Sequence, residues 1–186
     1  ALKNQRILPG EAVEFAQSFF DVKVAEVYSA YQKKLMLANS MDFDDLLLKA
    51  VELLETSDKS LDYWSTKFQF IMIDEYQDTN MVQYRLIELL SSKHKNICVV
   101  GDSDQSIYAF RGADIRNIEE FEKDFKNAKV ISLEKNYRSS QKILDIANSV
   151  ISNNPRKKDK KLWTENEEGL DVNMLEFNSE RDESRW

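Results

Sequence analysis

Two clusters of polar residues, each following an apolar run, have the residue types and spacing for chemistry. The apolar runs are residues 68–73 and 97–100. The polar residues behind them are Asp74, Glu75 and Asp78 after the first run, and Asp102, Asp104 and Gln105 after the second. Short uninterrupted apolar runs are typical of strands buried in a parallel sheet, and ligands bind beyond the carboxyl ends of such strands. Two of these ends side by side could hold a metal ion and a water for phosphate chemistry.

The acids at the first strand end suit nucleotide hydrolysis. In such enzymes one acid can hold magnesium, here Asp74, and the next can orient and deprotonate the attacking water, here Glu75. Gln105 could hydrogen-bond either a terminal phosphate or that water. An isolated Asp-Glu pair is more often a solvated strand end, but the acids on the second run favour a site.

A metal-dependent nuclease is an alternative reading of the same acids. Its two-metal cluster would use four carboxylates: Asp74, Glu75, Asp102 and Asp104. That chemistry leaves no role for Gln105 or for the aromatic residues that follow it.

Aromatic side chains next to arginines occur at two places. Tyr108, Phe110 and Arg111 offer flat stacking surfaces and a cation, the combination that single-stranded nucleic acid uses. A packing role for these two rings fits their spacing equally well. Tyr137 could stack on a base and Arg138 could clamp a phosphate, with a surface salt bridge as the alternative.

The surrounding pattern predicts strands that alternate with helices, and hence a mainly parallel sheet. The predicted strands are 68–73, 97–100 and 130–133, and the predicted helices are about 79–90, 114–126 and 139–151. Upstream, a stripe of apolar residues over 16–35 predicts a long helix with a buried face, and Asp42 can cap a second helix. Downstream, 172–177 alternates like a half-buried strand and a helix is expected from Ser179.

Composition limits the class of protein. Of 186 residues, 42% are hydrophobic and 32% charged, a globular balance, and no run is long enough to span a membrane. The one cysteine excludes an internal disulfide and fits a reducing cytoplasm. The net charge of −7 argues against a surface that is basic all over, and the basic run at 156–161 is more typical of a solvated loop than of a phosphate contact.

Four segments, taken together, resemble the UvrD/Rep/PcrA group of superfamily 1 DNA helicases. Residues 74–80 (DEYQDTN) resemble its motif II, 101–114 (GDSDQSIYAFRGAD) its motif III, 133–140 (LEKNYRSS) its motif IV, and 42–46 (DFDDL) the return from its inserted helical subdomain. The resemblance implies an ATP-dependent enzyme that moves on single-stranded DNA and unwinds duplexes, 3′ to 5′, in DNA repair or replication.

The resemblance also implies roles by position. Asp74 would hold Mg²⁺, Glu75 would activate water, and Gln105 would sense the terminal phosphate of ATP. Contacts to single-stranded DNA would come from Tyr108, Phe110 and Arg111, while Tyr137 would stack on adenine and Arg138 would reach the terminal phosphate. Phe110 departs from the family, which often has Trp there, and a smaller ring should still stack.

The resemblance assigns the chain to an internal part of a longer protein. The expected fold class is α/β, a partial RecA-like motor core. Residues 1–60 would belong to the inserted helical subdomain and its return, 61–154 to the first motor domain and 155–186 to the start of the second. No Gly-x-x-x-x-Gly-Lys-Ser/Thr occurs, because the only glycines are Gly10, Gly101, Gly112 and Gly169. We therefore expect the isolated chain to lack ATPase activity and to expose an apolar edge at 97–100, covered by self-association, by residues 1–40 or by crystal contacts.

Overall fold

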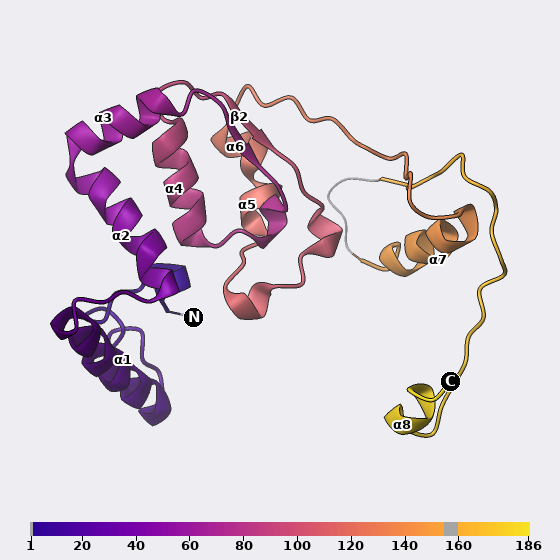
Figure 1. Ribbon diagram of the computed structural model, residues 1–186, viewed down its shortest axis with the longest axis horizontal. Coiled ribbons are helices and arrows are strands. Elements are labelled where there is room, and N and C mark those ends of the chain that lie inside the picture. The colour runs from indigo at the N-terminus through magenta and orange to yellow at the C-terminus, as the bar shows by residue number, and fades with distance from the viewer. Residues whose placement is uncertain (1, 155–159) are drawn as a thin grey trace. The chain divides into compact units, whose positions relative to one another are not determined.

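The computed structural model describes residues 2–154 and 160–186, which form two compact units (Figure 1). The units are Ala1–Ala128 and Lys129–Trp186. The domain boundary expected at 154–155 falls inside the second unit, at the edge of the described residues. Most of the basic run at 156–161 lies outside the described residues.

The first unit is mainly helical. Its helices are α1 (Phe19–Leu37), α2 (Phe43–Thr56), α3 (Asp58–Lys67), α4 (Met81–Ser91), α5 (Arg116–Glu119) and α6 (Phe121–Asp124). Its short 3₁₀ turns are η1 (Lys3–Gln5), η2 (Tyr76–Asp78), η3 (Ser103–Gln105) and η4 (Ala109–Arg111). Two strands complete it: β1 (Ile71–Ile73) and β2 (Ile97–Val99).

The hydrophobic core of this unit lies between α2 and α4, with α3 against both (Figure 1). The buried apolar residues are Val51, Leu54, Val82 and Leu89. Asp42 caps α2 as predicted, and Asn80 caps α4. Each side chain accepts a hydrogen bond from the third residue of its helix, in a reciprocal capping box. The predicted helices at Asp42 and over 79–90 are confirmed.

The apolar stripe of α1 is not a core face, contrary to the prediction. Phe19, Phe20 and Val27 are exposed by 80%, 73% and 68%, and Ala25 is the buried residue of this helix. The helix exists because Ser18 caps it and its residues favour helix, but the described part of the chain places no apolar layer over most of its stripe.

The sheet is smaller than the sequence indicated. β1 and β2 pair in parallel, with Ile71 opposite Ile97 and Ile73 opposite Val99, as expected for neighbouring strands. Met72 and Cys98 point to an open face and are exposed, so the prediction that both faces are buried was wrong. Over residues 2–154 and 160–186 the fold is therefore mostly helical, with one two-stranded parallel sheet.

Two further predicted strands do not form. Residues 130–133 and 172–177 form neither strand nor helix, and Ile131 and Leu133 are exposed. An apolar or alternating run becomes a strand only when a neighbour completes its backbone hydrogen bonds, and the described residues supply these two segments with none. The expected helix at 114–126 is divided into α5 and α6, which meet at Glu120.

The second unit contains α7 (Gln141–Ile151) and α8 (Glu180–Glu183). Leu144 is its buried apolar residue among those described. An isolated parallel bridge joins Lys135 to Trp163. Ser179 caps α8, which confirms the helix start predicted there. Among the described residues, no helix has the length and apolar character to cross a membrane.

Candidate functional site

The carboxyl ends of β1 and β2 lie side by side, which brings the two polar clusters together. Val100 N–H donates to the Ile73 carbonyl at 2.8 Å, and Tyr76 N–H donates to the Val100 carbonyl at 3.0 Å. These two bonds continue the parallel ladder one step beyond the strands. Asp74 and Gly101 therefore begin two adjacent loops at one edge of the sheet.

Asp74 and Glu75 present their carboxylates to solvent at this edge. Both residues are exposed, and Asp74 Oδ1 accepts the Glu75 N–H at 2.9 Å. Glu75 has a φ of 49°, a left-handed conformation that residues other than glycine seldom adopt. Such backbone conformations persist where surrounding structure holds them, often at functional sites.

Gln77 joins the two loops. Its side chain is only 1% exposed, yet it lies in the loop after β1. Its Nε2 donates to Glu75 Oε2 at 2.8 Å, and its Oε1 accepts the Asp102 N–H at 2.9 Å. A single buried amide thus connects the acid behind β1 with the backbone behind β2.

The connection continues to Gln105. Asp102 caps η3, accepting the Asp104 N–H at 2.9 Å through Oδ1, and its Oδ2 accepts Gln105 Nε2 at 3.0 Å. The predicted partners Glu75 and Gln105 therefore lie at the two ends of one line of hydrogen bonds, which runs through Gln77 and Asp102. The sequence analysis assigned no role to Gln77. Its place between Glu75 and Asp78 was a signal, because the amide of a glutamine side chain can bind a neighbouring carboxylate.

Buried polar contacts fix the loop that carries these residues. The Thr79 hydroxyl donates to the Tyr76 carbonyl at 2.7 Å, and Asn117 Nδ2 donates to the Thr79 carbonyl at 3.0 Å. Tyr76 is fully buried, with its ring edge-on to Phe121 at 5.6 Å between centroids. Burial raises the pKa of the Tyr76 phenol above its ordinary value, so this residue is neutral packing.

The aromatic residues of the motif III-like segment form an open cluster. Phe110 is 75% exposed, its ring lies 5.9 Å from that of Tyr108, and the Arg111 guanidinium lies 5.0 Å from the Tyr108 centroid and 5.5 Å from that of Phe110. Two open rings with a cation over them form a surface on which bases can stack. The exposure of Phe110 does not fit the packing alternative for that ring, whereas Tyr108, at 37% exposed, fits either role.

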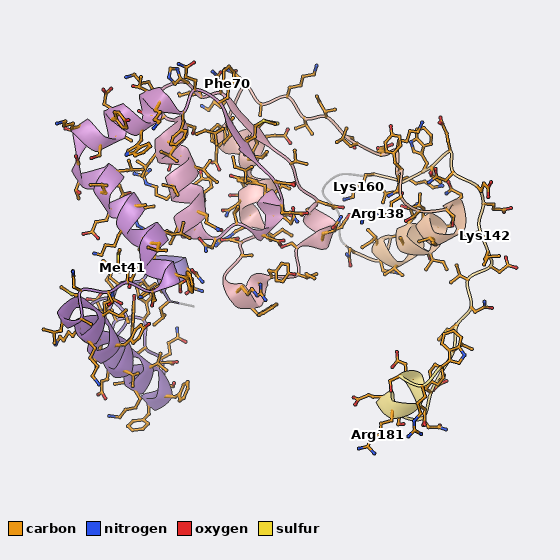
Figure 2. The ribbon with its side chains drawn as sticks, viewed as in Figure 1. Met41, Phe70, Arg138, Lys142, Lys160 and Arg181 are labelled. Carbon is orange, nitrogen blue, oxygen red and sulfur yellow. The ribbon has the colours of Figure 1, made fainter. Side chains whose placement is uncertain are left out.

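Tyr137 and Arg138 lie in the second unit, just before α7. Figure 2 labels Arg138 there. Both are exposed, and the Lys135 ammonium lies 5.3 Å from the Tyr137 ring centroid. Asn136 Oδ1 accepts the N–H groups of Arg138 and Ser139 at 2.9 and 2.7 Å, which fixes the turn that carries both side chains.

The four acids of the nuclease alternative are not gathered into a metal site. Over residues 2–154 and 160–186 there is no group of three or more His, Cys, Asp or Glu side chains that could hold a metal ion. A two-metal mechanism needs its carboxylates around one pair of ions.

Comparison with known proteins agrees with the motifs. Residues 1–126 match the UvrD/REP helicase N-terminal domain, and residues 131–186 match the UvrD-like helicase C-terminal domain. The chain is 50% identical over 185 residues to the ATP-dependent DNA helicase PcrA of Staphylococcus aureus (strain Mu50 / ATCC 700699) and 48% identical over 184 residues to that of Bacillus subtilis (strain 168). These alignments cover 100% and 99% of this chain and 25% of each relative, so the chain spans about a quarter of their length. The chain belongs to the UvrD/REP helicase family.

Proposed function

We propose that this chain is part of an ATP-dependent DNA helicase that couples ATP hydrolysis to movement on single-stranded DNA and to duplex unwinding, with 3′ to 5′ polarity. The family of the chain and the helicase activity named for its relatives support this assignment. The observation that carries it is the line from Glu75 through Gln77 and Asp102 to Gln105, which links two strand ends. A cytoplasmic location follows from the same proposal.

Each site residue has a proposed role. Glu75 orients and deprotonates the attacking water, Gln105 senses the terminal phosphate, and Arg138 stabilises charge on it with Tyr137 against adenine. Asp74 would hold Mg²⁺. Its exposed carboxylate suits this ion, because Mg²⁺ binds one or two carboxylates together with phosphate oxygens and waters. That ion would neutralise charge on the phosphates of ATP.

We place the chain in a RecA-like motor, with 1–60 from an inserted helical subdomain and its return, 61–154 from the first motor domain and 155–186 from the start of the second. The printed sequence carries no phosphate-binding loop of the Gly-x-x-x-x-Gly-Lys-Ser/Thr kind. Such a loop supplies the amides and the lysine that hold the phosphates. By itself, then, the 186-residue chain is proposed to be inactive as an ATPase.

The test is Glu75→Gln in the full-length protein that contains this segment. We expect DNA-stimulated ATP hydrolysis to fall by about 10²- to 10⁴-fold, because an amide cannot accept the proton of the attacking water. Glu14→Gln, an exposed acid outside the site, is the control and should leave the rate unchanged. Wild-type turnover in the Glu75→Gln protein would overturn the proposal, as would steady ATP turnover by the purified 186-residue chain.

A second function is proposed for the chain alone, namely weak binding of single-stranded DNA without catalysis. The exposed cluster of Tyr108, Phe110 and Arg111 favours it, because stacking needs no nucleotide. We also propose that the isolated chain self-associates through the open edge of its sheet.

A further inference from the structure

The buried amide of Gln77 has a definite orientation. Its partner at one end is the Asp102 backbone N–H, which can only donate, so the atom there is the carbonyl oxygen. Its partner at the other end is the Glu75 carboxylate, which when ionised can only accept, so the atom there is the NH₂ group. Neither a carboxylate nor an apolar side chain at position 77 could satisfy both ends.

Gly101 leaves the space that this amide occupies. A Cβ built on Gly101 would lie 2.5 Å from Gln77 Oε1, closer than van der Waals contact allows, and 2.9 Å from Ile118 Cδ1. The backbone behind β2 therefore has to be glycine for the Gln77 oxygen to reach the next N–H. The close approach is independent evidence that the two loops are built around this side chain.

The hydrogen bonds from Glu75 through Gln77 and Asp102 to Gln105 also restrain the two exposed side chains at their ends. Each is exposed, and an exposed side chain by itself samples many rotamers. Gln77 restrains the Glu75 carboxylate through Oε2, while Asp102, whose N–H is held by Gln77, restrains the Gln105 amide. A shift of the Gln77 amide would disturb both ends of the line.

We infer that Gln77 is a positioning residue that couples the Glu75 carboxylate to Gln105, so that a change at one strand end is transmitted to the other. The inference rests on the proposed function, because it assigns Glu75 and Gln105 to ATP hydrolysis. Gln77 itself contacts neither substrate nor metal in this role. Its substitution should lower the rate of the chemical step and its stimulation by DNA, and should leave ATP binding intact.

The experiment uses the full-length protein with three variants. Gln77→Glu keeps an oxygen for the Asp102 N–H but replaces the donor to Glu75 with a second carboxylate. Gln77→Met fills the space and loses both bonds. Gln69→Glu is the matched control, since it makes the same amide-to-acid change on an exposed side chain.

We expect kcat for DNA-stimulated ATP hydrolysis to fall by about 10- to 100-fold in Gln77→Glu and Gln77→Met, with KM for ATP within about twofold of wild type. The ratio of the ATPase rates with and without single-stranded DNA should fall in the same variants. If their melting temperatures match wild type, a general loss of stability cannot explain that fall. Gln69→Glu should match wild type in all three quantities.

Two outcomes separate the inference from the proposed function. If the wild-type protein shows no DNA-stimulated ATPase, the proposed function fails. If wild type is active and both Gln77 variants keep its kcat and its DNA stimulation, the inference alone is overturned. If the Gln77 variants do not fold, Gly101→Ala provides the second perturbation. Its Cβ would displace the Gln77 amide while every polar group remains. Wild-type kcat in a folded Gly101→Ala protein would overturn the inference.

Discussion

At the scale of single residues, exposure separates side chains that can meet a ligand from those that hold others in place. Glu75, Gln105 and Phe110 are exposed, while Gln77 and Tyr76 are almost completely buried. The motif-like spacing identified the exposed group directly. It could not distinguish Gln77 from its neighbours, because the partner of its carbonyl oxygen lies 25 residues further along the chain.

Phe110→Ala tests the stacking surface at this scale. If the isolated chain binds single-stranded DNA, we expect the substitution to weaken binding by about 1–3 kcal/mol, the usual contribution of one base stacked on an aromatic ring. Phe70→Ala is the matched control, because Phe70 is 77% exposed, against 75% for Phe110, and lies just before β1, away from the motif III-like segment (Figure 2). The measurement is the affinity of each variant for a labelled oligonucleotide at two salt concentrations. Equal effects of the two substitutions would contradict the proposal that Phe110 stacks on DNA bases.

At the scale of elements, a buried ion pair joins η1 to the beginning of α2. The Lys3 ammonium lies 2.7 Å from Asp42 Oδ2 and 2.9 Å from Asp45 Oδ1, and Lys3 and Asp45 are almost fully buried. Asp42 and Asp45 are also the two members of the capping box of α2. The same two carboxylates therefore start the helix and hold the N-terminal turn against it.

Lys3→Met should lower the free energy of unfolding by about 3–5 kcal/mol, because it leaves two carboxylates without their cation in a buried place. Lys49→Met is the matched control: the Lys49–Glu52 pair is more than half exposed, and its loss should cost about 0–1 kcal/mol. Urea denaturation at neutral pH, followed by tryptophan fluorescence, measures both. Similar small losses in the two variants would show that the Lys3 pair does not anchor η1.

The pH dependence of this ion pair has two limits. Burial lowers the pKa of Lys3, but the hydrogen bonds and charges of Asp42 and Asp45 outweigh that effect, so its pKa is raised above 10.5. Burial raises the pKa of Asp42, and the bonds from Lys3 and the Asp45 N–H outweigh it, so its pKa lies below 3.8. The Lys3 contribution is thus complete below about pH 10.5 and is lost as pH rises through the raised pKa. The Asp42 contribution is present above about pH 3.8 and is lost as pH falls through the lowered pKa, so the penalty of Lys3→Met should shrink in acid.

At the scale of the whole molecule, the chain exposes apolar surface on its two-stranded sheet. Met72 is 79% exposed on the open face of the sheet, and Cys98 beside it is exposed. Over the described ranges no further strand pairs with β2, so its outer edge keeps unpaired backbone groups. Residues 1–40 were one of the three expected covers of this edge, and within them η1 lies against α2 and α4.

Self-association of the 186-residue chain should therefore increase with concentration. Sedimentation velocity in reducing buffer, which excludes disulfide dimers, measures it. Cys98→Lys should shift the chain toward monomer, because a charge beside the edge opposes pairing, whereas Cys98→Ser should behave as wild type. A wild-type chain that stays monomeric at every concentration would rule out the open edge as an association surface.

The sequence alone predicted the helices that begin at Asp42 and near Thr79, the Asp42 cap, and the meeting of the two polar clusters. Local causes suffice for these: Asp42 and Asn80 cap their own helices, and parallel strands always bring their carboxyl ends to one edge. Only the tertiary structure decided which apolar runs become strands or core, because that depends on a partner elsewhere in the chain. Residues 130–133 and most of the stripe of α1 have the right pattern and no such partner among the described residues. Gln77 has an ordinary local pattern, and its bond to the distant Asp102 N–H places it between the two loops.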